Sequence, residues 1–215
     1  MSAVDPVTRL RAGDRSRATL GDALHLRGEG QAALWGLARE VRAGAFPAGQ
    51  VEVRSVVEVG NTCIQTCRFC TIPAAARDSA FLLDPTAIVE IVDQLYARGR
   101  RVVMLQAGEI RSQKFVRTVT EASAGIKAKH PDLDLILCVG SLPRAAYAGF
   151  RAAGADRFIL KFEASRPTLY QQIKPSETIE ARLRCLDDLV DLGFDVGTGN
   201  ITGLPGQVAE DLVDD

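Results

Sequence analysis

The chain contains Val56-Val-Glu-Val-Gly-Asn-Thr-Cys63-Ile-Gln-Thr-Cys67-Arg-Phe-Cys70, in which a short β-branched run leads directly into three closely spaced cysteines. The β-branched run predicts a strand at residues 56–60. The spacing C-x3-C-x2-C places three thiolates on the loop that follows this strand. Thiolates are soft ligands, and three of them on one short loop fit an iron-sulfur cluster best. We therefore expect a metal-binding loop at the carboxyl end of a first strand.

Downstream of this segment, short β-branched runs alternate with amphipathic helical patterns. Such alternation is typical of an α/β fold in which helical crossovers join parallel strands. One crossover helix is well marked, because Asp84 can cap it, Pro85 suits its first position and Gly99 suits its end. The predicted strands span residues 56–60, 101–106, 134–139, 157–162 and 195–201, and further crossover helices span 112–129, 143–153 and 178–192.

These elements predict a partial (β/α) barrel of the TIM type with about five parallel strands. The loop after a strand of such a barrel lies at the carboxyl-end rim, where the chemistry takes place. A complete eight-stranded barrel needs about 250 residues, whereas this chain of 215 residues ends within the predicted helix after strand five. We expect residues 1–50 to form an N-terminal helical appendage with a helix at 31–43. Residues 51–215 should form the barrel, truncated at its C-terminus.

The composition fits an ordinary cytoplasmic enzyme. The chain is 47% hydrophobic and 25% charged, with a formal net charge of -1. A nearly neutral chain has no bulk attraction for nucleic acid or for anionic membranes. No apolar run approaches the ~20 residues that span a bilayer. We therefore expect neither a nucleic-acid partner nor a membrane partner.

The number of local ligands indicates an open metal site. A closed 4Fe-4S site or a structural zinc site needs four ligands, but neither His25 nor His130 is near the cysteine triplet in sequence. Cys138 and Cys185 lie in segments that are predicted to form regular secondary structure. One iron is therefore expected to lack a protein ligand. The alternatives are a zinc knuckle, or a disulfide with a spare thiol, although disulfides are rare in reducing compartments.

The cysteine triplet, with Phe69 just before its last member, resembles the metal loop of the radical S-adenosylmethionine (SAM) superfamily. Other segments narrow the resemblance to the group of the iron-only hydrogenase maturase, methylornithine synthase and biotin synthase. Each of these segments is weak alone, and their order and spacing carry the resemblance. They are residues 105–109, 154–164, 169–175, 182–186 and 197–206, and they lie within 51–215.

The resemblance implies that Cys63, Cys67 and Cys70 hold a 4Fe-4S cluster, with the amino and carboxylate groups of SAM on the fourth iron. It implies catalytic roles for Glu163 and Lys161, the latter as a point charge for a carboxylate. The remaining implied contacts surround SAM at the ends of the strands and in one helix. These cofactor-binding residues are Phe69, Gln106, Gly108, Glu109, Glu163, Arg182, Gly199 and Ile201.

Each of these assignments has a plain structural alternative. Glu109 would otherwise be an exposed turn carboxylate, and Glu163 and Arg182 would otherwise form a structural ion pair. Residues 197–203 would otherwise be an ordinary glycine turn. A dinucleotide-binding fingerprint does not fit this segment, because its glycines have the wrong spacing and follow the fifth strand rather than the first.

The expected activity is reductive cleavage of SAM to a 5'-deoxyadenosyl radical, which abstracts hydrogen from a small substrate, with an amino-acid-like carboxylate as one candidate. Reduced flavodoxin or ferredoxin would supply the electron. Sulfur insertion of the biotin or lipoyl synthase kind is disfavoured, because position 197 is glycine and no cysteine precedes Cys63. The rival hypotheses are a catalytically silent cluster-binding fragment that serves as a redox or scaffold module, and a zinc-binding interaction domain.

Overall fold

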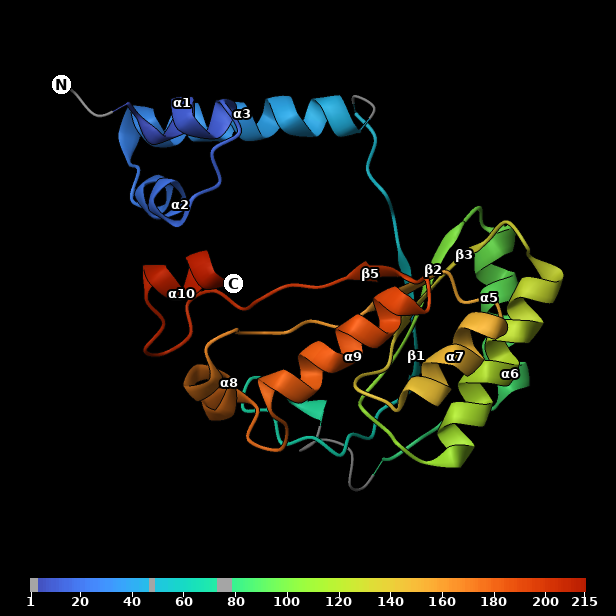
Figure 1. Ribbon diagram of the computed structural model, residues 1–215. Coiled ribbons are helices and arrows are strands. Elements are labelled where there is room, and N and C mark those ends of the chain that lie inside the picture. Colours follow the sequence, from blue (N-terminus) through green and yellow to red (C-terminus); the bar gives the residue numbers. More distant parts are fainter. Residues whose placement is uncertain (1–3, 47–48, 73–78) are drawn as a thin grey trace. The chain divides into compact units, whose positions relative to one another are not determined.

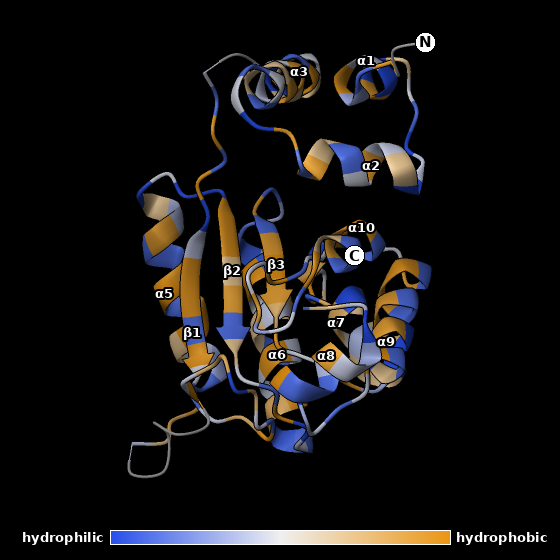
Figure 2. Ribbon diagram, turned by 90° about the vertical axis from the view of Figure 1, so that its left-hand side faces the viewer, coloured by the Kyte–Doolittle hydropathy of each residue, from blue (hydrophilic) through white to orange (hydrophobic). Residues whose placement is uncertain are grey.

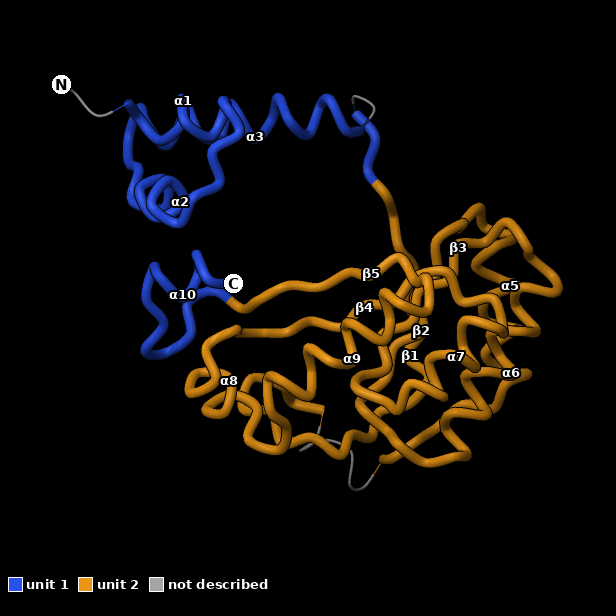
Figure 3. Tube along the Cα trace, in the orientation of Figure 1, with its two compact units in different colours: residues 1–51, 202–215 blue, residues 52–201 orange. Residues whose placement is uncertain are grey.

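The structure is a computed structural model of the 215-residue chain, and it describes residues 4–46, 49–72 and 79–215. The chain divides into two compact units, one made of residues 1–51 and 202–215 and the other of residues 52–201 (Figure 3). The second unit carries the sheet and the three cysteines of the predicted metal loop. The predicted domain division after residue 50 stays a prediction.

The second unit is built on one parallel sheet in the order β1-β2-β3-β4-β5 (Figure 1). Its register pairs Val57 with Leu105, Leu105 with Leu137, and Leu137 with Phe158, so one apolar row crosses the sheet. Figure 2 shows the hydrophobic stretches of β1, β2 and β3. The predicted α/β fold with five parallel strands is confirmed, and the sheet is open in the described residues, with β1 and β5 at its edges. The strands are β1 (Ser55–Gly60), β2 (Val102–Ala107), β3 (Asp134–Cys138), β4 (Arg157–Ile159) and β5 (Asp195–Gly197).

Helical crossovers join these strands, and consecutive crossovers pack against one another. Their starts follow from local sequence, because Asp84 accepts the Ala87 N–H at 2.9 Å and Thr178 accepts the Ala181 N–H at 3.2 Å. The apolar faces of these helices meet the sheet in one buried core. The crossover helices are α5 (Pro85–Ala97), α6 (Gln113–Lys129), α7 (Arg144–Ala152) and α9 (Ile179–Asp191).

Two details of the barrel differ from the sequence-based expectation. Strands β4 and β5 end at Ile159 and Gly197, earlier than expected, and Glu163, beyond the end of β4, adopts a φ of 67°. Beyond these ends the two segments stay in contact, since the Leu160 N–H donates to the Gly197 carbonyl at 2.9 Å and an isolated parallel bridge joins Glu163 to Asn200. The helix α8 (Pro167–Ile173) was not predicted, since seven residues are too few to display a clear helical period.

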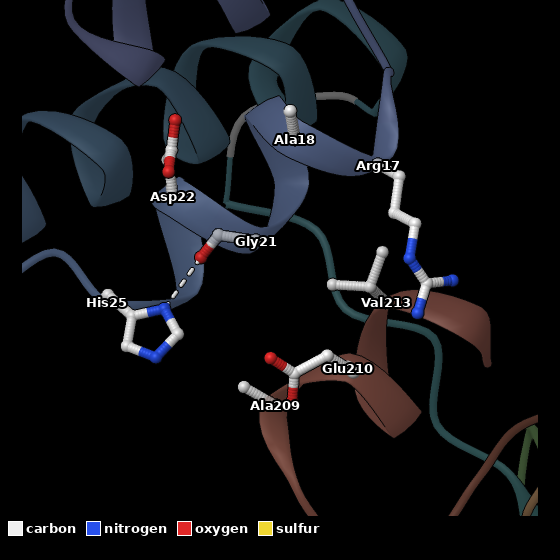
Figure 4. A pocket seen from close by; sticks show the side chains of 8 residues that line it. All are labelled: Arg17, Ala18, Gly21, Asp22, His25, Ala209, Glu210 and Val213. Carbon is white, nitrogen blue, oxygen red and sulfur yellow. Dashed lines mark hydrogen bonds between the residues drawn. The ribbon is translucent and has the colours of Figure 1, made fainter.

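The first unit is helical in its described residues. It contains α1 (Pro6–Arg11), α2 (Arg17–Leu24), α3 (Gly28–Ala45) and α10 (Ala209–Asp214). Helix α3 covers the predicted helix at 31–43, and α2 packs against both α1 and α10. A cleft of about 550 Å³ lies between α2 and α10, with Arg17 and His25 in its wall (Figure 4). Among the described residues, no helix has the length and apolar character that a membrane span requires.

Candidate active site

A cavity of about 230 Å³ lies at the carboxyl ends of the strands in the second unit. The cysteine loop, the end of β2, the segment after β4, the α8–α9 loop and α9 all contribute to its wall. The cleft of the first unit is larger, but the three cysteines of the predicted metal loop line the smaller cavity, so we place the candidate site there. The predicted site residues in the cavity wall are Cys63, Cys67, Phe69, Cys70, Gln106, Gly108, Glu109, Lys161, Glu163 and Arg182.

The first attachment of the cysteine loop is to the end of strand β2. Cys63 Sγ accepts the N–H of Glu109 at 3.2 Å and the N–H of Gln65 at 3.4 Å, and the Ile64 N–H donates to the Glu109 carbonyl at 2.9 Å. Gly108 makes this approach possible, because a Cβ there would collide with the Thr62 carbonyl and lie 2.6 Å from the Cys63 Cβ. Strand β2 therefore fixes the first thiol.

The second attachment of the loop is to the segment between α8 and α9. The Arg68 N–H donates to the Ile173 carbonyl at 2.8 Å, and the Thr66 N–H donates to Ser176 Oγ at 3.1 Å. The Ser176 hydroxyl in turn donates to Gln65 Oε1. The loop is therefore held from two sides by segments that are far apart in the sequence.

Glu109 is a buried connecting residue, with only 4% of its surface exposed. Its Oε1 accepts from Gln65 Nε2 at 2.6 Å and from Arg111 Nη2 at 2.7 Å, while Oε2 accepts the Ser141 N–H at 3.0 Å. The alternative of an exposed turn carboxylate is therefore wrong. Because these oxygens tie the cysteine loop to the end of β3, a direct contact of Glu109 with SAM stays a prediction.

Glu163 presents the least satisfied carboxylate of the cavity wall. It is 4% exposed, and its Oε2 has no hydrogen-bond partner among the described residues. Burial raises the pKa of Glu163, and the nearby charges of Lys161 and Arg182 oppose that rise. A buried acceptor without a donor, on a residue with a left-handed backbone, is the arrangement expected where a ligand completes the site.

Arg182 is buried and held by partners that the sequence did not predict. Its Nη1 donates to Ser141 Oγ at 2.7 Å and lies 3.7 Å from Glu109 Oε2, and its Nε lies 3.5 Å from Glu177 Oε2. These are structural ion pairs, made with Glu109 and Glu177. The predicted contact of Arg182 with SAM stays a prediction.

Lys161 lines the cavity, and this distinguishes it from the two predicted residues after β5, Gly199 and Ile201. Lys161 is exposed and lines the cavity together with Glu163, as the shared strand parity predicted. Gly199 and Ile201 are absent from the residues that line the cavity in the described part of the chain. They flank Glu163 through the main chain, since the Glu163 N–H donates to the Gly199 carbonyl at 3.1 Å and the Ile201 N–H donates to the Glu163 carbonyl at 2.8 Å.

The two cysteines outside the triplet occupy different places. Cys138 lines the cavity at the end of β3, and burial raises the pKa of its thiol. Cys185 packs at the edge of the apolar core. All five cysteines are free thiols. The disulfide alternative from the sequence has no counterpart among these residues.

The chemistry of the three thiols suits an iron-sulfur cluster. Among residues 4–46, 49–72 and 79–215, no three His, Cys, Asp or Glu side chains are grouped so that they could hold one metal ion. A 4Fe-4S cluster binds each cysteine through a different iron, so its ligand sulfurs stand further apart than those around one ion. Three free thiols on one cavity wall fit that arrangement.

The sequence interpretation missed the residues that hold the cysteine loop in place. Gln65, Lys174 and Glu177 are buried polar residues beneath it, and the exposed Ser176 binds both Gln65 and the Thr66 N–H. Gln65 lies within the cysteine motif, and Lys174 precedes a proline in one of the segments that carried the resemblance. No periodicity or spacing identifies Gln65, Lys174 or Ser176, because their contacts join segments that are about 110 positions apart.

Comparison with known proteins decides the family. The sequence model of the Radical SAM superfamily matches residues 57–215. The chain belongs to the radical SAM superfamily. This family uses a 4Fe-4S cluster and SAM, so membership supports an enzyme that takes both cofactors.

Curated radical SAM relatives include a hydrogenase maturase and several biotin synthases. The FeFe hydrogenase maturase subunit HydE of Thermotoga maritima is 30% identical over 217 residues, which cover 100% of this chain and 61% of HydE. A biotin synthase of Cutibacterium acnes is 28% identical over 156 residues, which cover 71% of this chain and 43% of that enzyme. The chain thus spans less than two thirds of the length of either relative.

Solved structures show that the radical SAM fold is shared. The crystal structure of methylornithine synthase, PylB, matches with a TM-score of 0.81 and 22% identity, over 97% of this chain and 62% of PylB. The structure of the FeFe-hydrogenase maturase HydG from Carboxydothermus hydrogenoformans matches with a TM-score of 0.84 and 20% identity, over 96% of this chain and 49% of HydG. At these identities the likeness establishes the fold alone.

Proposed function

We propose that Cys63, Cys67 and Cys70 hold the 4Fe-4S cluster of a radical SAM enzyme that acts on a small substrate. One observation carries the proposal: three free thiols and the unpaired carboxylate oxygen of Glu163 line the same cavity. The three thiols would hold the cluster, which when reduced would supply one electron for cleavage of SAM to methionine and a 5'-deoxyadenosyl radical that would abstract hydrogen from the substrate.

The cavity residues fit SAM in charge and in hydrogen-bonding capacity. Glu163 offers a buried acceptor that suits an ammonium or hydroxyl donor of SAM. Gln106 and the Gly108 main chain lie in the same wall, where they can orient the bound molecule. Arg182 is held by Glu177 and Ser141, so its charge stays in place beneath the cavity whether or not SAM is bound. These residues bind and orient SAM, and the buried wall limits its contact with water.

Lys161 supports the finer part of the proposal, which concerns the substrate. Its ammonium is exposed in the cavity wall, where it would attract a carboxylate as a point charge. This supports an amino-acid-like substrate, as expected for an enzyme similar to the hydrogenase maturase or methylornithine synthase. Reduced flavodoxin or ferredoxin as the electron donor, and a cytoplasmic location, complete the proposal.

The test of this function is production of 5'-deoxyadenosine by the reconstituted chain. The chain would be loaded anaerobically with iron and sulfide, reduced with dithionite and incubated with SAM. We expect product from the wild-type chain and at least a ~100-fold loss in Cys67→Ala, because the cluster requires every thiolate. Cys185→Ala is the matched control, since Cys185 packs at the core edge, and it should keep wild-type turnover. Wild-type turnover in Cys67→Ala would contradict the assignment.

The open edge of the sheet at β5 favours a second candidate, a catalytically silent cluster-binding module. Such a module would serve as a redox or scaffold unit, and it would bind the cluster without cleaving SAM. Iron and sulfide analysis beside the product assay separates the two functions: a full cluster with product supports the enzyme, and a full cluster without product supports the module. Zinc in place of iron would support the zinc-binding domain instead.

A further inference from the structure

Lys174 is a buried lysine whose ammonium lies against the metal loop. Only 2% of its surface is exposed, and its Nζ lies 3.7 Å from Cys67 Sγ. The same nitrogen lies 3.3 Å from Glu177 Oε2 and 3.8 Å from Glu109 Oε2. A lysine is almost never buried so completely without partners. Here its partners are two carboxylates and one thiol of the triplet.

We propose that Lys174 is a positioning residue that orients Cys67 and raises the reduction potential of the cluster held by the cysteine triplet. The proposal rests on the proposed function, because it needs the cluster in place. Lys174 acts through Cys67, and it is assigned no contact with SAM or with the substrate. No other residue role in the proposed function depends on it.

The sign of the effect follows from the charges. Reduction adds one electron to the cluster, so a fixed positive charge beside a ligand sulfur stabilises the reduced form. The low dielectric of a buried site strengthens this interaction. Loss of Lys174 would remove this positive charge and would also leave the negative charges of Glu109 and Glu177 less compensated. Each of these two changes would disfavour reduction of the cluster.

The contacts of Cys63 and Cys67 differ in a way that makes the proposal testable. Cys63 Sγ accepts from the main-chain N–H groups of Gln65 and Glu109, which substitution of those side chains would not remove. Cys67 Sγ accepts from a side chain, so the interaction can be deleted or altered alone. Lys174 also follows Ile173, whose carbonyl holds the Arg68 N–H, so the main-chain attachment of the loop should survive a change of the side chain.

The experiment is a redox titration of the reconstituted chain, with the reduced cluster measured by electron paramagnetic resonance at set solution potentials. In Lys174→Met we expect the ratio of reduced to oxidised cluster at a fixed potential to fall at least tenfold, which for one electron corresponds to a shift of about 59 mV to more negative potential. Lys174→Arg keeps the positive charge and should recover most of this loss.

Two further variants complete the test. Lys127→Met is the matched control, because Lys127 also pairs with a carboxylate, Asp156 at 3.0 Å, but lies near the amino ends of the strands. It should leave the potential unchanged. Glu177→Gln removes a negative charge beside Lys174 and should shift the potential in the opposite direction, toward easier reduction. This variant also decides the case if Lys174→Met takes up no cluster.

The outcomes separate this proposal from the one on which it rests. A wild-type chain that takes up no cluster would overturn the proposed function and this inference with it. A wild-type chain with a full cluster, and an unchanged potential in Lys174→Met, would overturn the role of Lys174 alone. If Lys174→Met takes up no cluster, an unchanged potential in Glu177→Gln would overturn it. A fall in cluster content without a shift in potential in the remaining clusters would reduce Lys174 to a structural residue and would also overturn the proposal.

Discussion

The two ends of the parallel sheet both carry charged clusters, but they bury them very differently. At the amino end, the Arg157 guanidinium pairs with Glu52, Asp134 and Asp195, and its side chain keeps 27% of its surface exposed. At the carboxyl end, Lys174, Glu177, Glu109 and Arg182 have side chains that are only 3–7% exposed. Exposed pairs cost little and contribute little, whereas buried ones carry a large desolvation cost. The costly cluster lies where the cofactors are expected.

The largest expected effect comes from breaking the buried cluster. Arg182→Met leaves Glu109 and Glu177 with one cation fewer inside the protein, and loss of a buried partner typically costs about 3–5 kcal/mol. Urea unfolding of the metal-free chain should show this loss in the free energy of unfolding. Arg144→Met is the matched control, because Arg144 pairs with Asp188 and Asp191 at an exposed surface, and it should leave the unfolding midpoint unchanged. A small effect of Arg182→Met would contradict the contrast between the two ends.

A second, smaller effect concerns the unpaired carboxylate. The raised pKa of Glu163 means that the folded chain binds this proton more tightly than the unfolded chain. Ionised Glu163 therefore destabilises the metal-free protein, and this destabilisation grows as the pH rises from the ordinary glutamate pKa through the raised one. Glu163→Gln should raise the free energy of unfolding by about 1 kcal/mol at pH 7 and by nothing below about pH 4.

Denaturant titrations over this pH range check the prediction. Glu58→Gln serves as the control, because Glu58 is an exposed carboxylate of β1, and its unfolding should match the wild type at every pH. A Glu163→Gln variant that is less stable than wild type at pH 7 would show that the carboxylate is already satisfied in the metal-free protein.

The smallest effect is expected at the amino end. Arg157→Met removes the shared partner of three carboxylates, but solvent screens these pairs. We expect a loss of about 1 kcal/mol or less at low ionic strength, shrinking further when salt is raised toward 1 M. Unfolding measured at two salt concentrations tests this directly. A salt-independent loss as large as that of Arg182→Met would remove the distinction between the ends of the sheet.

Most of the fold could be predicted from local sequence, because local chemistry determines it. Asp84 and Pro85 start α5 where the capping pattern placed them, and the β-branched runs form the five strands. The early ends of β4 and β5 could not be predicted. The left-handed backbone at Glu163, beyond the end of β4, could not be predicted either, because local propensity disfavours it and only the tertiary structure can impose it.

The residues of the candidate site could likewise be predicted only in part. The cysteines were found from their spacing, and Glu109 and Glu163 from the resemblance of their segments to those of radical SAM enzymes; the structure brings all of them to one cavity. Lys174 and Ser176 were not, because their roles come from contacts with a loop more than 100 positions earlier in the chain. A lysine before a proline looks like ordinary loop sequence until the fold buries it.

The missing side chain at Gly108 has a consequence for how the cofactor is acquired. Because the cysteine loop rests directly on the end of β2 at this position, main-chain contacts with that segment hold the Cys63 thiol in place. Binding of the cluster would then require little further ordering of the loop, because that segment would already have lost most of its conformational entropy during folding. The cluster would then bind to a loop that folding has already positioned.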